Sequence, residues 1–176
     1  PHEDATVDTS VQFNMMAGAF VGGEADYVAL FEPTATEVEL AGQGVVLCSI
    51  GEQSGEIPYT AYFAAQSYLT ENADIVLRFT RAIARGQQWV YAHTDRELAE
   101  AIVGYFPDTS VEVLEKVAAR YKGIRAWKET PDMKQEALER LETVMEQAGE
   151  LSQRVAYEAL VENEFAYHVM AEMGQK

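Results

Sequence analysis

The stretch that decides the expected fold reads Gly22-Gly23-Glu24-Ala25-Asp26-Tyr27-Val28-Ala29-Leu30-Phe31-Glu32-Pro33. Two glycines that would end a helix come first, an apolar run follows, and an acid and a proline close the stretch. A run without polar alternation is typical of a strand buried on both faces of a parallel sheet. Ligands of such sheets bind just beyond the carboxyl ends of the strands. Glu32 is therefore expected where a ligand would bind.

The segments on either side extend this pattern into an alternation of strands and helices. Apolar residues at helical spacing precede the stretch, and Pro33 suits the first turn of a following helix, because that turn needs no N–H donor there. The expected elements are strands over residues 5–7, 27–31 and 45–50 and helices over residues 10–22 and 34–41. This order predicts an α/β fold with a parallel βαβαβ sheet and crossover helices.

Residues 51–58 differ in character from the segments around them. They contain two glycines, a proline and small polar residues, a composition typical of a linker or hinge. Residues 59–64 are expected to form one more strand, and the pattern is then helical almost to the end. Capping-box patterns open two of these helices, at Thr94 and at Thr109-Ser110. We expect a division near residue 55, into an α/β segment over 1–55 and a crossover strand with C-terminal helices over 56–176.

The composition limits the classes of partner. The 176 residues carry 13 Lys and Arg against 29 Asp and Glu, a net charge of −16, which argues against nucleic-acid binding and against docking to an anionic membrane. The single cysteine, Cys48, excludes an internal disulfide; it lies in an apolar run, and we interpret it as a buried structural thiol. His2, His93 and His168 lack metal-type spacing, and we expect no metal site.

Four residues in the first part of the chain are candidates for ligand binding, and each has a plain structural alternative. Glu32 would accept hydrogen bonds from an amine, an amide or a protonated heterocycle; alternatively, it complements the dipole of the helix that follows it. Phe31 would stack on a flat ligand, or it would lie in the core. Thr9 and Ser10 would bind an anion at a helix N-terminus, or they would only cap that helix. Asp8, next to them, would repel an anion.

Residues 23–33 resemble the Gly-x-x-Asp, apolar run, Trp or Phe, Glu-Pro segment of ABC-importer substrate-binding proteins of the nitrate, sulfonate and thiamine-pyrimidine-precursor type. The rest of the chain keeps that family's order of segments, so the likeness covers nearly the whole sequence. The matching segments are an apolar strand ending near Ile50, Ile57-Pro58-Tyr59, the helix from Thr70, Trp127 before Thr130-Pro131-Asp132, Gly149-Glu150-Leu151 and Tyr157-Glu158-Ala159-Leu160-Val161.

The resemblance implies a two-lobed clamp of the periplasmic-binding-protein type II fold that closes over a small ligand. Residues 1–55 would belong to the second lobe, and the chain would then cross back at a hinge that includes Ser54, Gly55 and Pro58, with Tyr59 as a further ligand contact. The first lobe would be absent from this sequence. The implied partners are a small-molecule ligand, an ABC permease, and a second copy or a separate polypeptide in place of the first lobe. The implied location is a periplasm or a cell surface, with any signal or lipid anchor upstream of Pro1.

The expected function is solute binding without catalysis or a cofactor. Residues 1–77 contain no Lys or Arg; this argues against nitrate or sulfonate, because an anion needs cationic donors, and favours a neutral, amine-bearing or pyrimidine-like ligand. Two alternatives stay open: an effector-sensing or assembly module that reuses the fold, and an enzyme like the thiamine-pyrimidine synthases that resemble this family. Those synthases carry a cysteine-rich motif and a cofactor lysine, whereas this chain has one cysteine and no lysine before Lys116.

Overall fold

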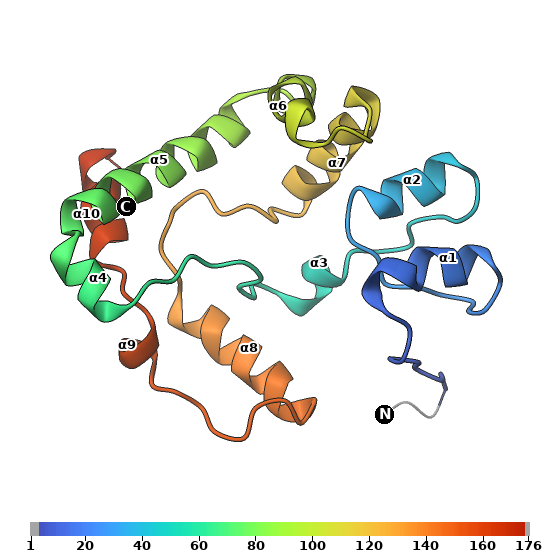
Figure 1. Ribbon diagram of the computed structural model, residues 1–176, viewed down its shortest axis with the longest axis horizontal. Helices are drawn as coiled ribbons and strands as arrows, with labels where there is room; N and C mark the ends of the chain where they lie inside the picture. The colour runs from blue at the N-terminus through green and yellow to red at the C-terminus, as the bar shows by residue number, and fades with distance from the viewer. Residues whose placement is uncertain (1–3, 175–176) are drawn as a thin grey trace. The chain divides into compact units, whose positions relative to one another are not determined.

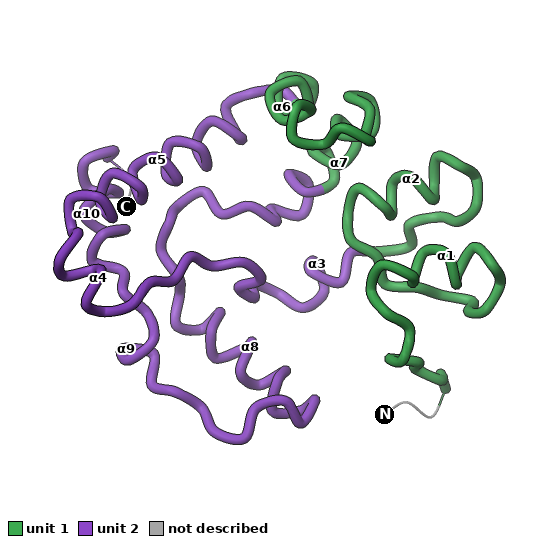
Figure 2. Tube along the Cα trace, in the orientation of Figure 1, with its two compact units in different colours: residues 1–48, 95–120 green, residues 49–94, 121–176 purple. Residues whose placement is uncertain are grey.

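The computed structural model describes residues 4–174 as short and medium helices joined by non-helical segments (Figure 1). The described residues divide into two compact units (Figure 2). Unit 1 contains the chain up to Cys48 together with Asp95–Arg120, and unit 2 contains Ser49–Thr94 together with the chain from Tyr121 onward. The chain therefore passes from one unit to the other three times, first at residues 48 and 49.

Unit 1 contains two groups of helices from distant parts of the sequence. The first group comprises the 3-10 turn η1 (Phe13–Met15), α1 (Met16–Val21) and α2 (Thr34–Leu40), and the second comprises α6 (Asp95–Ile102), the 3-10 turn η2 (Val103–Tyr105) and α7 (Val111–Gly123) as far as Arg120. Its buried apolar side chains come from α6 and α7: Leu98, Ala99, Leu114, Val117 and Ala118.

Unit 2 contains the longest helix of the described chain, α5 (Ala73–Ala92), which packs on α10 (Glu164–Glu172). Arg81 on α5 donates through Nε and Nη2 to both carboxylate oxygens of Glu172, at 2.8 and 2.9 Å. The other helices of the unit are α3 (Ile50–Ser54), α4 (Gln66–Glu71), α8 (Gln135–Gln147) and α9 (Tyr157–Leu160). No helix among the described residues combines the length and the apolar character that a membrane crossing requires.

The predicted parallel sheet is wrong, because residues 4–174 contain no strand. A strand is stabilised by backbone hydrogen bonds to a neighbouring strand, and an apolar run specifies only one side of that pairing. The segments expected as strands are non-helical over residues 27–31 and 45–49, and many of their side chains are exposed, with Tyr27 at 77% and Val45 at 75%. The sequence has the apolar pattern of buried strands, but residues 4–174 lack the strand pairing that would bury these side chains.

Two further expectations about this region are also wrong. The strand expected to end at Ile50 gives way to helix α3, because the Ser49 hydroxyl oxygen accepts the Glu52 backbone N–H at 3.3 Å and caps a helical turn. Cys48 is exposed, so it is not a buried structural thiol. The apolar side chains beside it are also exposed to solvent; Leu47, for example, is 70% exposed.

Helical periodicity and capping signals locate the later helices more closely. The Ser110 hydroxyl oxygen accepts the Val113 backbone N–H at 3.3 Å at the start of α7, as its capping pattern predicts. The helix expected from Thr70 is divided at Asn72, where the backbone leaves helical geometry between α4 and α5. The helical pattern near the end of the chain is likewise divided, into α9 and α10.

Candidate functional site

Glu32 lies directly before Pro33, and its carboxylate caps helix α2. Its Oε2 accepts the Thr36 backbone N–H at 3.0 Å, and the Pro33 nitrogen carries no hydrogen to compete for it. The side chain is only 8% exposed. This contact corresponds to the helix-capping alternative for Glu32: a carboxylate at a helix N-terminus satisfies free N–H groups and complements the helix dipole.

Arg120 on α7 connects Glu32 to two further polar side chains of α2. Its Nη1 donates to Glu32 Oε1 at 3.0 Å and to Thr36 Oγ1 at 2.7 Å, and its Nη2 donates to Glu39 Oε2. Thr36 is fully buried, so its hydroxyl needs this partner. One guanidinium therefore joins three side chains of unit 1. We call Glu32, Thr36, Glu39 and Arg120 the Arg120 cluster.

Glu39 contributes a second carboxylate to the Arg120 cluster. Its Oε1 accepts the Val46 backbone N–H at 3.2 Å. This bond and the bond from Arg120 lower the pKa of Glu39, and the charge of Lys116 acts in the same direction. Burial opposes ionisation of Arg120, but its hydrogen bonds to Glu32 and Glu39 outweigh that effect and raise its pKa. Both carboxylates thus have a favourable cationic environment.

Reasoning from sequence missed Arg120, because it stands 88 residues from Glu32. The absence of Lys and Arg from residues 1–77 argues against an anionic ligand only if no cation from elsewhere reaches Glu32, and the structure brings Arg120 to this carboxylate. The available signal was the spacing of Lys116 and Arg120, which places two cations on one face of a predicted helix. Nothing in the pattern indicated which acids that face would meet.

Phe31 precedes the cluster and contacts a second aromatic ring. The rings of Phe31 and Phe13 lie 5.3 Å apart between centroids with their planes tilted by 49°, within the range of aromatic pairs. Both are partly exposed, Phe31 at 43% and Phe13 at 64%. The expectation that Phe31 lies in a closed core therefore does not hold, and its role as a stacking surface stays a prediction.

Thr9 and Ser10 lie at the beginning of unit 1, and no helix starts at them. Ser10 donates from its backbone N–H and its hydroxyl to Asp8 Oδ1, at 2.8 and 2.7 Å, and these bonds lower the pKa of Asp8. The first helical turn begins only at Phe13. The helix N-terminus expected at Thr9 and Ser10 is therefore wrong, since the Asp8 side chain engages Ser10 locally. Binding of a ligand there stays a prediction.

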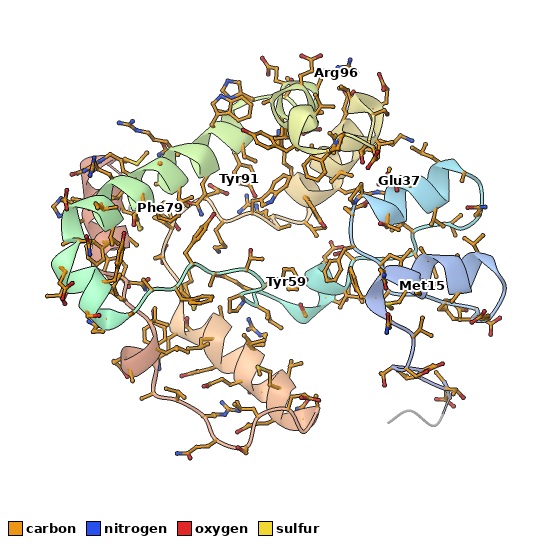
Figure 3. All side chains as sticks on the ribbon, in the orientation of Figure 1. Met15, Glu37, Tyr59, Phe79, Tyr91 and Arg96 are labelled. Atoms are coloured by element: carbon orange, nitrogen blue, oxygen red, sulfur yellow. The ribbon has the colours of Figure 1, made fainter. Side chains whose placement is uncertain are left out.

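The predicted hinge residues and Tyr59 belong to unit 2. Gly55 has a φ of 76°, which favours glycine, and a Cβ on it would lie 3.3 Å from the guanidinium carbon of Arg140. Arg140 Nη1 also donates to the backbone oxygen of Glu56 at 2.7 Å, which holds this turn against α8. Tyr59 lies on the non-helical segment after α3 and is 77% exposed (Figure 3).

The structure thus brings two of the predicted ligand residues together and leaves the others apart. Glu32 belongs to the Arg120 cluster in unit 1 and Phe31 precedes it in the chain, whereas Ser10, beside Thr9 in the same unit, bonds to Asp8. Ser54, Gly55, Pro58 and Tyr59 form the segment of unit 2 just described. Among the described residues, no group of three or more histidine, cysteine or acidic side chains is arranged to hold a metal ion.

Comparison with known proteins agrees with the motif around Glu32. The chain is 40% identical over 172 residues to the "Putative binding protein YtlA" of Bacillus subtilis (strain 168), an alignment that covers 98% of this chain and 52% of that protein. The chain thus spans about half the length of the curated relative that it matches. No solved structure matches the chain. The family described as NMT1/THI5 like matches residues 3–97, more than half of the sequence and the whole Glu32 segment, and the chain therefore belongs to the NMT1/THI5-like family.

Proposed function

We propose that this chain is a solute-binding component of an ABC-type importer and that it binds a small amine-bearing or pyrimidine-like ligand without catalysis. Membership of the NMT1/THI5-like family supports solute binding, and the relative YtlA carries the name of a binding protein. The observation that carries the proposal is the Arg120 cluster, because it gathers ordered charged and polar groups at the Glu-Pro motif, within the residues that match the family.

We propose that the partners are an ABC permease and a second polypeptide that completes the ligand site. The chain spans about half of YtlA, and several large apolar side chains of residues 27–50 are exposed. Exposed apolar patches of this kind mark interaction surfaces. The second polypeptide would be another copy of this chain or a separate partner protein that covers these side chains. A location in a periplasm or at a cell surface follows from the importer proposal.

The absence of catalysis is part of the proposal and has support in composition. A thiamine-pyrimidine synthase would need a cysteine-rich motif and a cofactor lysine, and this sequence has Cys48 alone and no lysine before Lys116. An effector-sensing or assembly module is the second candidate. A permease and an ATPase encoded beside this chain would argue for the importer component.

A thermal-shift screen of the full chain tests the proposal. The panel contains thiamine-related pyrimidines, riboflavin-like heterocycles, sulfonates and polyamines, and each is tested on the wild type and on Glu32→Gln. A ligand present at one hundred times its Kd stabilises the folded state by about 2.7 kcal/mol, enough to raise the Tm by several degrees. We expect one class to stabilise the wild type and to stabilise Glu32→Gln less. If no class shifts the Tm, this chain does not bind such solutes; an equal shift in Glu32→Gln would place the ligand elsewhere.

A further inference from the structure

We propose, resting on the solute-binding function above, that Arg120 contacts the ligand, that Glu32 is the residue that positions Arg120, and that the ligand is an uncharged planar heterocycle with a hydrogen-bond acceptor. The motif alone assigns recognition to Glu32. The geometry of the Arg120 cluster assigns it to the arginine, because the two side chains differ in exposure, in free hydrogen-bonding capacity and in the cost of meeting a charged ligand.

The side chains of Glu32 and Arg120 differ in how far they are exposed to solvent. The Glu32 side chain is 8% exposed and Thr36 is fully buried, whereas the Arg120 side chain is 29% exposed. A ligand that approaches the cluster from solvent therefore meets the guanidinium before it meets the carboxylate. Glu32 and Thr36 lie beneath it and orient it through Nη1, in the way that buried partners orient the groups that contact a ligand.

Arg120 also retains donors that the cluster does not use. A guanidinium carries five N–H donors in a planar fork. Nη1 donates to Glu32 and Thr36, and Nη2 donates once, to Glu39. Within residues 4–174, the Nε–H and the second hydrogen of Nη2 have no hydrogen-bond partner. These two unused donors suit a ligand that offers a carbonyl oxygen or a ring nitrogen.

The charges of the cluster disfavour an ionic ligand of either sign. The carboxylates of Glu32 and Glu39 are balanced by Arg120 and by Lys116, whose charge acts on Glu39. An ammonium group would have to displace Arg120 from Glu32, and an anion would have to approach two carboxylates. Binding of either ion would therefore break or weaken a partly buried charge pair. A neutral acceptor adds hydrogen bonds and breaks none.

The aromatic pair next to the cluster favours a flat ligand. Phe31 adjoins Glu32 in the chain, and its ring and that of Phe13 are both partly exposed, with their centroids 5.3 Å apart. Planar rings stack on aromatic faces and also on the plane of a guanidinium. A planar heterocycle would therefore contact both the aromatic pair and the Arg120 guanidinium, whereas an aliphatic solute would lack the stacking contact.

Isothermal titration calorimetry on the full chain at pH 7.5 tests the inference with four probes of similar size: cytosine, uracil, benzylamine and benzenesulfonate. We expect the neutral pyrimidines to bind at least tenfold more tightly than the cation or the anion. Arg120→Gln should weaken pyrimidine binding by about 10- to 100-fold, the range for loss of hydrogen bonds to a charged group. Arg120→Lys should fall in between, because lysine keeps the charge but lacks the fork.

A double-variant cycle separates positioning from contact. If Glu32 acts only through Arg120, Glu32→Gln weakens binding less than Arg120→Gln does, and the double variant binds no more weakly than Arg120→Gln alone. The matched control is Arg96→Gln. Arg96 belongs to the same unit and pairs with three acids, Glu100, Glu112 and Glu115, none of which is a member of the Arg120 cluster. Its substitution should leave affinity unchanged.

Each contrary result overturns a stated part of the inference. Wild-type affinity in Arg120→Gln refutes the contact, and a double variant whose loss equals the product of both single losses shows that Glu32 contacts the ligand itself. Tightest binding of benzylamine or benzenesulfonate refutes the ligand class and leaves solute binding intact. If none of the four probes binds, the ligand class fails; if the wider thermal-shift panel also fails, the proposed function fails with it. If Arg120→Gln does not fold, Arg120→Lys decides.

Discussion

Replacing Arg120 with methionine removes the cation from a nearly buried carboxylate and keeps much of the volume of the side-chain stem. Glu32, at 8% exposure, would then keep only its hydrogen bond from the Thr36 backbone N–H among the described residues. Removing one partner of a buried charge pair costs about 3–5 kcal/mol. Arg120 itself is 29% exposed, so water will reach the carboxylate partly, and we expect the lower end, about 3 kcal/mol. That is a large fraction of the usual stability of about 5–15 kcal/mol.

Urea unfolding followed by far-ultraviolet circular dichroism measures this loss. Circular dichroism is preferred to tryptophan fluorescence because Trp89 and Trp127 both belong to unit 2, whereas the cluster belongs to unit 1. With an m-value of about 2 kcal/mol/M, the midpoint should fall by about 1.5 M. Adding Glu32→Gln to Arg120→Met should recover part of the loss, since a neutral amide no longer leaves a buried charge unpaired.

The control and the refuting result come from a second arginine. Arg96→Met removes three ion pairs in the same unit, but its side chain is 45% exposed, and solvent-exposed ion pairs contribute little to stability. If Arg120→Met lowers the midpoint no more than Arg96→Met, or if Glu32→Gln makes it worse, the carboxylate is not held as a buried charge and the reasoning fails.

Three further outcomes follow from other parts of the structure. Gly55→Ala should lower stability by about 1 kcal/mol or more because φ is +76°, whereas Gly18→Ala, in the interior of α1 with open space at its Cβ position, should raise it by about 0.5–1 kcal/mol; equal midpoints in urea would contradict this. The hydrogen bonds from Arg81 lower the pKa of Glu172 from its ordinary value of 4.5, so the stabilisation is present above that pH and is lost as pH falls through the lowered pKa. The difference in urea midpoint between wild type and Arg81→Gln should therefore shrink from pH 6 to pH 3, and a constant difference would refute the linkage. Cys48 should react with a thiol reagent in the native chain at the rate of an exposed thiol, and reaction only after unfolding would show that it is buried.

The helices of this chain could be located from sequence because their signals are local. Ser110 caps α7 as its pattern predicts, and apolar spacing identifies the helical region of α5. The end points were less predictable. Asn72 interrupts a continuous helical pattern between α4 and α5 through its backbone geometry, which periodicity does not report.

Of the candidate site, only the motif around Glu32 could be predicted from the sequence. The Glu-Pro motif predicts Glu32 as a site residue, although the strand expected before it does not form. Only the structure identified Arg120, Thr36 and Glu39 as members of the site. Thr36 and Glu39 lie one and two helical turns after Glu32 and could be placed near it from sequence, whereas Arg120 depends on how α7 meets α2, a long-range contact that no local pattern specifies.

The error in the predicted fold and the proposed need for a second polypeptide have the same physical origin. Tyr27, Val45 and Leu47 stand in runs with the composition of strands buried on both faces, yet they are exposed here, as is Cys48 between them and α3. A natural sequence rarely carries such a conflict between local pattern and environment unless the pattern serves a contact elsewhere. The chain aligns over nearly its whole length with about half of YtlA. The proposed partner would resolve the conflict by covering these side chains, and the Arg120 cluster, whose bonds lie within unit 1, would keep Glu32 and Arg120 in place before that partner binds.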